Sequence, residues 1–301
     1  MTNSAILPGM PQRLSAKRPM KPTIAIVGAG NLASAMAVAL HAAGYTIEQI
    51  ISRGRAASLQ RARRLASEVG ASAVAAESAQ IHGEVVWFCV PDAAISGAAT
   101  SLRNATDWSG KVALHSSGAL ASNELAELRR RGAAAASVHP LMTFVHGSRP
   151  LLTGVPFAIE GDLRAVRTAR AIVLDLHGQP FSIRKRHKEA YHAWGMFVSP
   201  LLTALLSVSE STAFAAGIRR SEARDRMLPI LKQTLANYAA LGAPESFSGP
   251  IARGDVETVR EHLKSLRTVP QAREVYLALA RAALRVLPAK NRAALEKILK
   301  R

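Results

Sequence analysis

Short apolar runs alternate with helical patterns over the first half of the chain. The β-branched run at residues 23–27 ends at Gly28, which is typical of a buried strand. Similar runs predict further strands at residues 47–52, 84–90, 111–115, 133–138 and 155–160. Residues 32–43 and 56–69 have helical patterns, and a glycine that can close a helix follows each of them. This alternation predicts right-handed crossovers and therefore a doubly wound, mostly parallel α/β sheet.

The pattern changes near Ile183, after which no strand-like alternation occurs again. Helices are expected at residues 185–214, 220–241, 256–265, 270–286 and 289–299. We therefore expect two domains, an α/β domain at residues 23–183 and an all-α domain at residues 184–301. Residues 1–21 contain three prolines and four basic residues, which predict a disordered basic tail over residues 1–22.

One helical stretch, residues 190–209, contains no Asp, Glu, Lys or Arg. Its length could just span a bilayer. However, it includes His192, Gly195, three serines and Pro200, and no second predicted helix of this length is uncharged. We therefore expect a buried central helix, kinked by Pro200 just after Ser199, and no membrane association.

Length and composition exclude several classes of protein. A chain of 301 residues that is 49% hydrophobic can bury a core in each of two domains, so it is not a disordered protein. The single cysteine, Cys89, excludes a disulfide framework and a Cys-rich zinc site, and we expect no metal. Cys89 lies in an apolar run and is expected in the core. A reducing, cytoplasmic location fits this composition.

The strongly basic charge has two interpretations. Lys and Arg number 39 against 21 Asp and Glu, a formal net charge of +18. Such a charge suits nucleic-acid binding, because cations displace counterions from phosphates. However, 29 of the 39 basic residues are arginines in an alanine-rich chain, a bias that GC-rich coding alone would produce. No helix-turn-helix, zinc or aromatic RNA-binding pattern accompanies the charge, so we expect no nucleic-acid partner.

A glycine-rich loop, GAGNLA, lies directly between the first strand and the first helix. Gly28 allows a tight turn, Gly30 lets the backbone approach a pyrophosphate, and Ala33 permits close packing of helix on strand. The helix N-terminus then offers free N–H groups to the phosphates. We predict a dinucleotide-binding loop formed by Gly28, Ala29, Gly30, Asn31, Leu32 and Ala33.

The end of the second predicted strand indicates which dinucleotide is preferred. An NAD enzyme places Asp or Glu there to hold the ribose hydroxyls, whereas this chain has Ser52 and Arg53, with Arg55 nearby. A hydroxyl and a guanidinium suit a 2′-phosphate, so we predict NADP(H) as the cofactor. The alternative is that Arg53 is an ordinary solvated arginine at a strand end.

Together these motifs resemble a known group of proteins. The group is Rossmann-like, with two domains, and its helical C-terminal half is a domain of unknown function; it is related to pyrroline-5-carboxylate reductase, prephenate dehydrogenase and the β-hydroxyacid dehydrogenases. The resemblance extends from Thr23 to about Leu287. Its markers are GAGNLA at 28–33, VPD at 90–92, HSSGA at 115–119, HPLMTF at 139–144, KEAYHAW at 188–194 and SGPIARGD at 248–255.

The resemblance implies where the chemistry lies. The β-hydroxyacid dehydrogenases have a catalytic Lys followed four positions later by an amide residue, and Lys188 and His192 match that spacing, with His in place of Asn. Their Ser-Gly-Gly turn, which binds substrate, is similar to the sequence beginning at Ser117, although its last glycine is replaced by alanine. The functional His-Pro pair of prephenate dehydrogenases is similar to the pair that begins at His139.

Helical geometry supports the same location. One stripe of the helix lies within about 60° and contains Lys188, His192, Gly195 and Ser199. The stripe is charged only at its start, which predicts that it faces a cleft, where Gly195 would leave room for a ligand. We predict Lys188 as the acid/base group, because partial desolvation would lower its pKa toward neutrality. The alternative is a surface lysine at a helix start.

The remaining site residues are predicted from position and chemistry. His192 and Ser117 would orient the substrate, and the other predicted substrate contacts are Gly118, His139, Ser199 and Arg253. The residues expected near the nicotinamide ribose are Val90, Pro91 and Asp92. His139 could instead be a structural turn residue, and His115 is expected to pack under the loop. Arg253 would hold an anionic group across a dimer interface; the alternative for that loop is that Asp255 caps the next helix.

These features predict an NADP-dependent oxidoreductase that acts on a small, anionic carbonyl, hydroxy-acid or imine substrate. The alternative is an NADP-binding sensor that lacks hydride chemistry, because the Ser-Gly-Gly match is imperfect and His192 replaces Asn. The uncharged helix must be buried somewhere, and related folds bury it between subunits, so we expect a homodimer.

Overall fold

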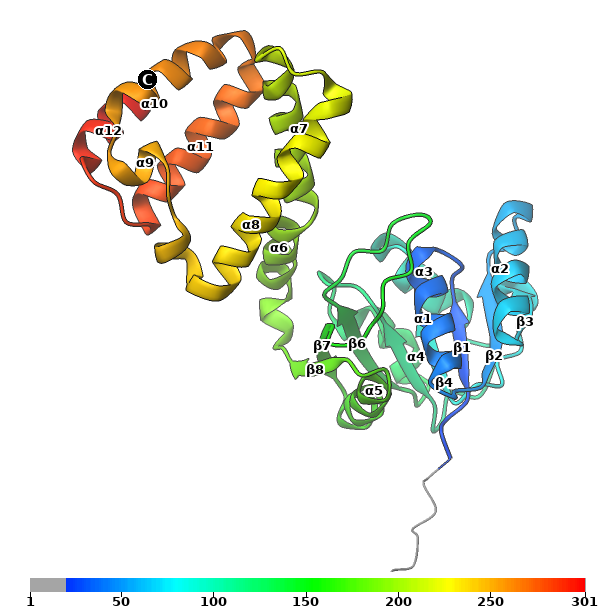
Figure 1. The fold of residues 1–301 in the computed structure, drawn as a ribbon. Coiled ribbons are helices and arrows are strands. Elements are labelled where there is room, and N and C mark those ends of the chain that lie inside the picture. Colours follow the sequence, from blue (N-terminus) through cyan, green and yellow to red (C-terminus); the bar gives the residue numbers. More distant parts are fainter. Residues whose placement is uncertain (1–19, 301) are drawn as a thin grey trace, which may run out of the picture. The chain divides into compact units, whose positions relative to one another are not determined.

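The computed structural model describes residues 20–300, so most of the expected basic tail, residues 1–19, lies outside the described residues (Figure 1). The chain divides into two units, Met1–Gly195 and Met196–Arg301. The division falls later than the domain boundary expected at Ile183. The reason is that the first turns of helix α6 (Lys188–Val198) belong to the first unit, where Lys188 and Tyr191 are buried.

One sheet forms the centre of the first unit. Its strands are β1 (Ile24–Val27), β2 (Ile47–Ser52), β3 (Ser72–Ala75), β4 (Val85–Phe88), β5 (Val112–His115), β6 (Ala134–Pro140), β7 (Pro156–Gly161) and β8 (Gln179–Ser182). Their order in the sheet is β3-β2-β1-β4-β5-β6-β7-β8. The pairs among β1 to β6 are parallel, whereas β7 is antiparallel to β6 and β8 is parallel to β7. The predicted doubly wound, mostly parallel sheet is confirmed.

Helices cover both faces of this sheet (Figure 1). Ile24 and Ile26 of β1 point to one face, where α1 (Asn31–Ala42), α2 (Ala56–Val69) and α5 (Leu163–Asp175) pack. Ala25 and Val27 point to the other face, against α3 (Ile95–Ser101) and α4 (Ala126–Arg130). Because both faces are covered, the strands read as continuous apolar runs, which is why the sequence revealed them.

The second unit is helical, as expected. Its helices, with α6 leading into them, are α7 (Pro200–Ala215), α8 (Arg220–Ser246), α9 (Pro250–Arg253), α10 (Val256–Ser265), α11 (Pro270–Val286) and α12 (Arg292–Leu299). Val259 of α10, Leu284 of α11 and Leu295 of α12 are at most 2% exposed and form the centre of its core. Gly242, with a φ of 77°, interrupts α8 near its C-terminal end.

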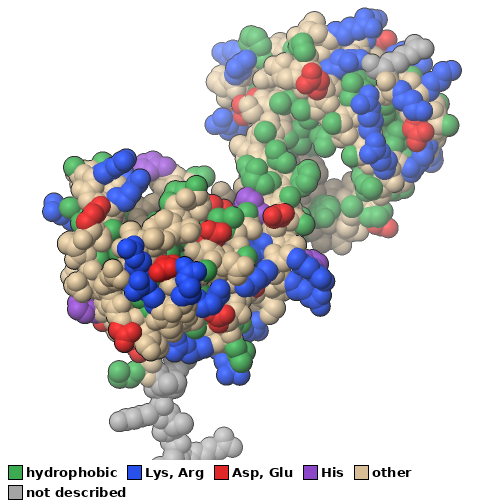
Figure 2. All heavy atoms as spheres, turned by 180° about the vertical axis from the view of Figure 1, so that it is seen from behind, with side chains coloured by type: hydrophobic (Ala, Val, Ile, Leu, Met, Phe, Trp, Pro, Cys, Tyr) green, Lys and Arg blue, Asp and Glu red, His purple; other side chains and the backbone are tan. Residues whose placement is uncertain are grey.

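The uncharged stretch is largely exposed in the single chain, and its burial between subunits stays a prediction. The stretch breaks at Ser199, whose φ and ψ of −130° and −82° are not helical, and Pro200 begins α7. No residue of α7 is buried, and Phe197 is 69% exposed. Hydrophobic side chains are visible on the surface of the helical unit in Figure 2. By length and composition alone, residues 185–215 could cross a membrane, and one such stretch is weak evidence for that.

Candidate functional site

The glycine loop lies between β1 and α1, as expected. Steric crowding explains why its first residue is a glycine. Gly28 has a φ of +119°, and a Cβ there would lie 2.3 Å from the carbonyl oxygen of Cys89 at the end of β4. The Gly28 N–H donates to the Ile51 carbonyl at 2.8 Å. The loop therefore passes tightly between β2 and β4, and any side chain at Gly28 would push it out of this position.

The second glycine of the loop faces open space. A Cβ at Gly30 would meet nothing within 4 Å, and Gly30 caps α1 without a side-chain hydrogen bond. No acidic side chain lies in the first turn of α1, while Ala33 is fully buried against the sheet. Free backbone N–H groups beside open space suit a pyrophosphate, so these residues fit a dinucleotide.

The loop after β2 combines basic side chains with one carboxylate. Ser52 is buried, and Arg53 and Arg55 are exposed; neither arginine forms an ion pair within the described part of the chain. The Glu77 carboxylate, in a short turn after β3, accepts the Gly54 N–H at 3.1 and 3.3 Å. The sequence reasoning missed Glu77 because it missed β3, the strand that brings Glu77 to this loop.

The ends of β4 and β5 are joined by a side-chain hydrogen bond. Ser117 Oγ, just past β5, donates to Asp92 Oδ2 at 2.8 Å and accepts the Leu120 N–H at 2.8 Å. Asp92 is exposed and follows Val90 and Pro91 at the end of β4. Asp92, which is expected near a nicotinamide ribose, is therefore in contact with Ser117, which is expected to orient the substrate.

His115 and Cys89 lie beneath this edge and take no part in a surface site. His115 is fully buried; its Nδ1 accepts the Ser117 N–H at 3.2 Å, and its Nε2 lies 3.0 Å from the Ala121 carbonyl. Burial lowers the pKa of His115 to about 4. Burial raises the pKa of the Cys89 thiol to about 12. His115 packs under the loop and Cys89 in the core, as the sequence indicated.

Lys188 is the most unusual residue of the site, because it is charged and only 1% exposed. Its Nζ donates to the Ser117 carbonyl at 2.9 Å and to Ser137 Oγ at 2.6 Å. Burial lowers the pKa of Lys188 to about 8, although the negative charges of Glu160 and Asp92 oppose the shift. The alternative of a surface lysine is therefore wrong, and Lys188 ties α6 to β6 and to the turn after β5.

Two histidines lie against Gly118, and a tyrosine is hydrogen-bonded to one of them. His139 Nδ1 and the Tyr191 hydroxyl are hydrogen-bonded at 2.9 Å, and the His139 and His192 rings lie 6.4 Å apart. A Cβ at Gly118 would lie 2.8 Å from His139 Nε2 and from His192 Cδ2, so both rings require glycine there. Burial, followed by the positive charge of Lys188, lowers the pKa of His139 to about 4.

The structure thus gathers five predicted residues in the first unit: Lys188, His192, Ser117, Gly118 and His139. Tyr191 and Ser137 belong to the same cluster but were not predicted as site residues. Tyr191 lies within the KEAYHAW marker beside His192, whereas Ser137 lies in no marker. Gly195 does not face open space, because a Cβ there would lie 3.5 Å from Leu141 Cδ1.

Ser199 and Arg253 belong to the second unit, and their substrate contacts stay predictions. Arg253 is exposed at the end of α9. In the same loop, Asp255 Oδ1 accepts the Thr258 N–H at 3.1 Å, so Asp255 caps α10 as the alternative proposed.

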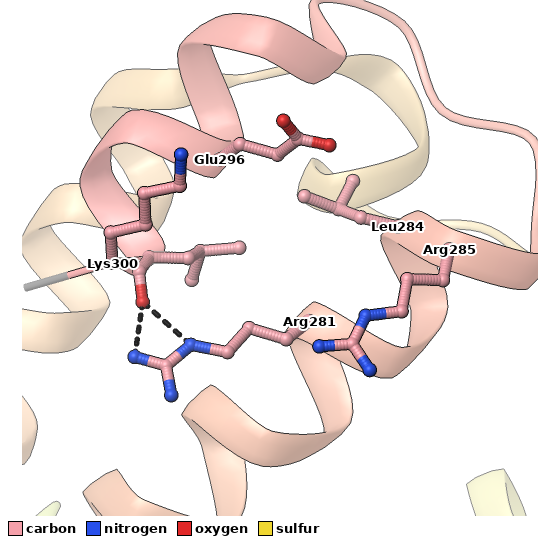
Figure 3. A pocket seen from close by; sticks show the side chains of 6 residues that line it. Arg281, Leu284, Arg285, Glu296 and Lys300 are labelled. Atoms are coloured by element: carbon pink, nitrogen blue, oxygen red, sulfur yellow. Dashed lines mark hydrogen bonds between the residues drawn. The ribbon is translucent and has the colours of Figure 1, made fainter.

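A separate pocket lies between α11 and α12 of the second unit (Figure 3). Its lining is formed by Arg281, Leu284, Arg285, Glu296, Leu299 and Lys300. Arg281 Nε and Nη2 donate to the Leu299 carbonyl at 2.8 and 2.5 Å. Because the last carbonyls of a helix lack backbone donors, Arg281 caps the end of α12. The arginine in this pocket therefore has a structural role at the end of a helix.

The basic charge is spread over both units on the face seen in Figure 2, with acidic side chains interspersed. Several arginines form surface ion pairs, such as Arg129 with Asp162 at 2.8 Å. Arg53 and Arg55 form no ion pair within residues 20–300, and they follow β2 at the edge of the sheet where the glycine loop lies.

Comparison with known families identifies the two parts of the chain. Residues 9–140 match a family model described as Rossmann-like domain, and residues 155–283 match one described as Domain of unknown function (DUF2520). The protein therefore combines a Rossmann-like domain with a DUF2520 domain, as its motifs indicated. No curated protein matches the chain.

Solved structures share the fold. A candidate NADP oxidoreductase from Bacteroides fragilis has a TM-score of 0.73 at 21% identity, over 87% of this chain and 97% of that one. A reductive aminase from Aspergillus terreus, in complex with NADPH and ethyl-5-oxohexanoate, has a TM-score of 0.62 at 18% identity, over 92% of this chain and 99% of that one. A pyrroline-5-carboxylate reductase from Coxiella burnetii has a TM-score of 0.57 at 13% identity, over 93% of this chain and 98% of that one. At these identities the likeness establishes the fold alone.

Proposed function

We propose that the protein is an NADP(H)-dependent oxidoreductase that transfers hydride between nicotinamide and a small carbonyl, hydroxy-acid or imine substrate. One observation carries this proposal. The glycine loop after β1 and the polar cluster after β4 and β5 share the carboxyl edge of the sheet, where the strand order switches from β1 to β4. Open α/β sheets bind ligands at this switch point. The NADP-linked names of two similar structures support the same class.

The cofactor would lie along this edge. Residues 28–33 would hold the pyrophosphate, Ser52 and Arg53 the 2′-phosphate, and residues 90–92 the nicotinamide ribose. When bound, the nicotinamide supplies or accepts a hydride. The protein's own contribution is to hold the cofactor, orient the substrate and provide a proton.

For the proton we retain Lys188, because a pKa of about 8 suits an acid/base group at neutral pH. Since Nζ is buried beneath the Ser117 turn, this role requires that the turn or α6 shift when substrate binds; catalytic contacts often form only in the complex. Ser117 and His192 would orient the substrate, and Gly118 and His139 would contact it. Arg253 and Ser199 stay candidates for an anionic substrate group.

Two measurements test the proposal. Titration with NADPH and with NADH, followed by nucleotide fluorescence, should show saturable binding with NADPH preferred. Oxidation of NADPH should then be screened against keto acids, cyclic imines and aldehydes. Turnover with one of these classes supports the oxidoreductase, and absence of binding to either nucleotide refutes it.

The second candidate is a cofactor-binding sensor. It is favoured by the burial of Lys188 and by the departure of His192 from the amide of the related enzymes. Tight NADPH binding without turnover across the whole panel would favour the sensor over the enzyme.

We also propose a cytoplasmic homodimer without nucleic-acid or membrane partners. The exposed apolar side chains of α6, α7 and α8 support self-association: Trp194, Phe197, Leu201, Phe214, Ile230, Leu235, Tyr238 and Leu241 are 45% to 69% exposed. Surface of this kind in a single chain marks an interface. Light scattering coupled to size-exclusion chromatography should give twice the 32.0 kDa chain mass; a concentration-independent monomer would contradict the dimer.

A further inference from the structure

A carboxylate occupies the loop where the 2′-position of the adenosine ribose would lie. β2 and β3 are parallel and in register, with Ser52 beside Ala75. Glu77, two residues past Ala75, therefore reaches the loop that follows Ser52. Its carboxylate accepts the Gly54 N–H with both oxygens, at 3.1 and 3.3 Å. A Cβ at Gly54 would lie 3.0 Å from Glu77 Oε2, so the carboxylate rests directly over this glycine.

The contact is exposed and charged. The N–H groups of Glu77 itself and of Gly54 lower the pKa of the carboxyl, so it is ionised at neutral pH. Arg53 and Arg55 flank Gly54 but form no ion pair with Glu77 or another carboxylate within the described residues. The loop thus offers two kinds of group to a ribose: guanidiniums that suit a phosphate and a carboxylate that suits a hydroxyl.

We propose that Glu77 sets the choice between NADP(H) and NAD(H), by accepting the 2′-hydroxyl of NAD(H) and opposing the 2′-phosphate of NADP(H). This inference rests on the proposed function, because it requires that a dinucleotide bind along this edge. The acid that an NAD-binding protein supplies from the end of β2 is here supplied from the turn after the neighbouring strand. The arginines favour the phosphate, and Glu77 limits that preference.

The proposed preference depends on the Gly54 N–H group. A phosphate held by Arg53 would compete with the Glu77 carboxylate for this N–H, and the two anions would repel each other. The 2′-hydroxyl of NAD(H) is a donor and needs the carboxylate to stay where it is. Removing the charge while keeping the shape should therefore strengthen NADPH binding and leave NADH binding equal or weaker.

The experiment measures dissociation constants of NADPH and NADH by fluorescence for the full-length protein and three variants. Glu77→Gln removes the charge and keeps an acceptor oxygen, whereas Glu77→Asp keeps the charge. Glu48→Gln is the matched control, because Glu48 lies near the other end of β2 and its loss changes the net charge equally. Circular dichroism and the Tm show that each variant is folded.

The expected result is a rise of about tenfold or more in the NADPH preference of Glu77→Gln, with no rise in Glu77→Asp or Glu48→Gln. Because the effect is electrostatic between exposed groups, it should shrink at high salt. A preference that changes less than twofold in Glu77→Gln, or that rises equally in Glu48→Gln, overturns the inference alone. If the wild-type protein binds neither nucleotide, the proposed function and the inference both fail.

Discussion

Lys188 should make the stability of the protein depend on pH in a way that a single substitution removes. The perturbation is Lys188→Met, which keeps an unbranched side chain, one atom shorter, and removes the amine. In the folded chain Nζ is 1% exposed, and burial lowers its pKa from 10.5 to about 8. Unfolding returns the amine to water and to its ordinary pKa.

The sign follows from proton linkage. Between about pH 8 and pH 10.5 the unfolded state binds more protons than the folded state, so the free energy of unfolding rises with pH. A shift of this size corresponds to about 3 kcal/mol, at roughly 1.4 kcal/mol for each pKa unit. Below pH 8 the penalty of the buried charge is present in full and the contribution is flat.

The assay is urea denaturation of wild type and Lys188→Met at pH 7, 8, 9 and 10. From pH 7 to pH 10, the free energy of unfolding of the wild type should rise by about 2–3 kcal/mol relative to that of the variant. Tyr45, Cys89 and Tyr191, whose pKa values burial raises, titrate in both proteins and cancel in the difference. Parallel stability curves for the two proteins would refute the burial of a charged amine beneath the Ser117 turn.

Three further predictions follow from single contacts. Gly28→Ala should cost at least about 2 kcal/mol in urea denaturation and abolish NADPH binding, since its Cβ would lie 2.3 Å from the Cys89 carbonyl; retained binding would argue against the tight loop. Asp255→Ala should lower the urea midpoint through loss of the α10 cap, and Asp255→Asn should lower it less. Stability should fall as pH drops from 6.5 toward 4, because burial lowers the pKa of His115 and of His139 to about 4. A His115→Gln variant should lose part of this pH dependence, and an unchanged pH dependence would contradict the contribution of His115.

Much of the fold could be predicted from the sequence alone, because several elements have strong local patterns. The bounds expected for β2, α2, α10 and α11 agree with the structure. These elements have either a continuous apolar run in a covered sheet or a clear amphipathic period ended by Gly or Pro. The glycine loop was equally clear, because its chemistry is local to six consecutive residues.

What the sequence left out depends on contacts between distant segments. β3 and β8 are four-residue strands that are only partly buried, so they lack a strong apolar run. Glu77 gains its place from the pairing of β2 with β3, and nothing beside it in the chain indicates Gly54. Likewise the pattern could suggest Lys188 as a site residue but could not show its burial, because Ser117 and Ser137 are 71 and 51 residues away.

The measurement that tests the central claim most directly is a crystal structure of the protein with NADP(H) bound. The account predicts the pyrophosphate on residues 28–33 at the start of α1, the 2′-phosphate beside Arg53, and nicotinamide C4 facing the cluster of Ser117, Gly118 and His139. Nucleotide bound elsewhere on the chain, or a nicotinamide turned away from that cluster, would contradict it.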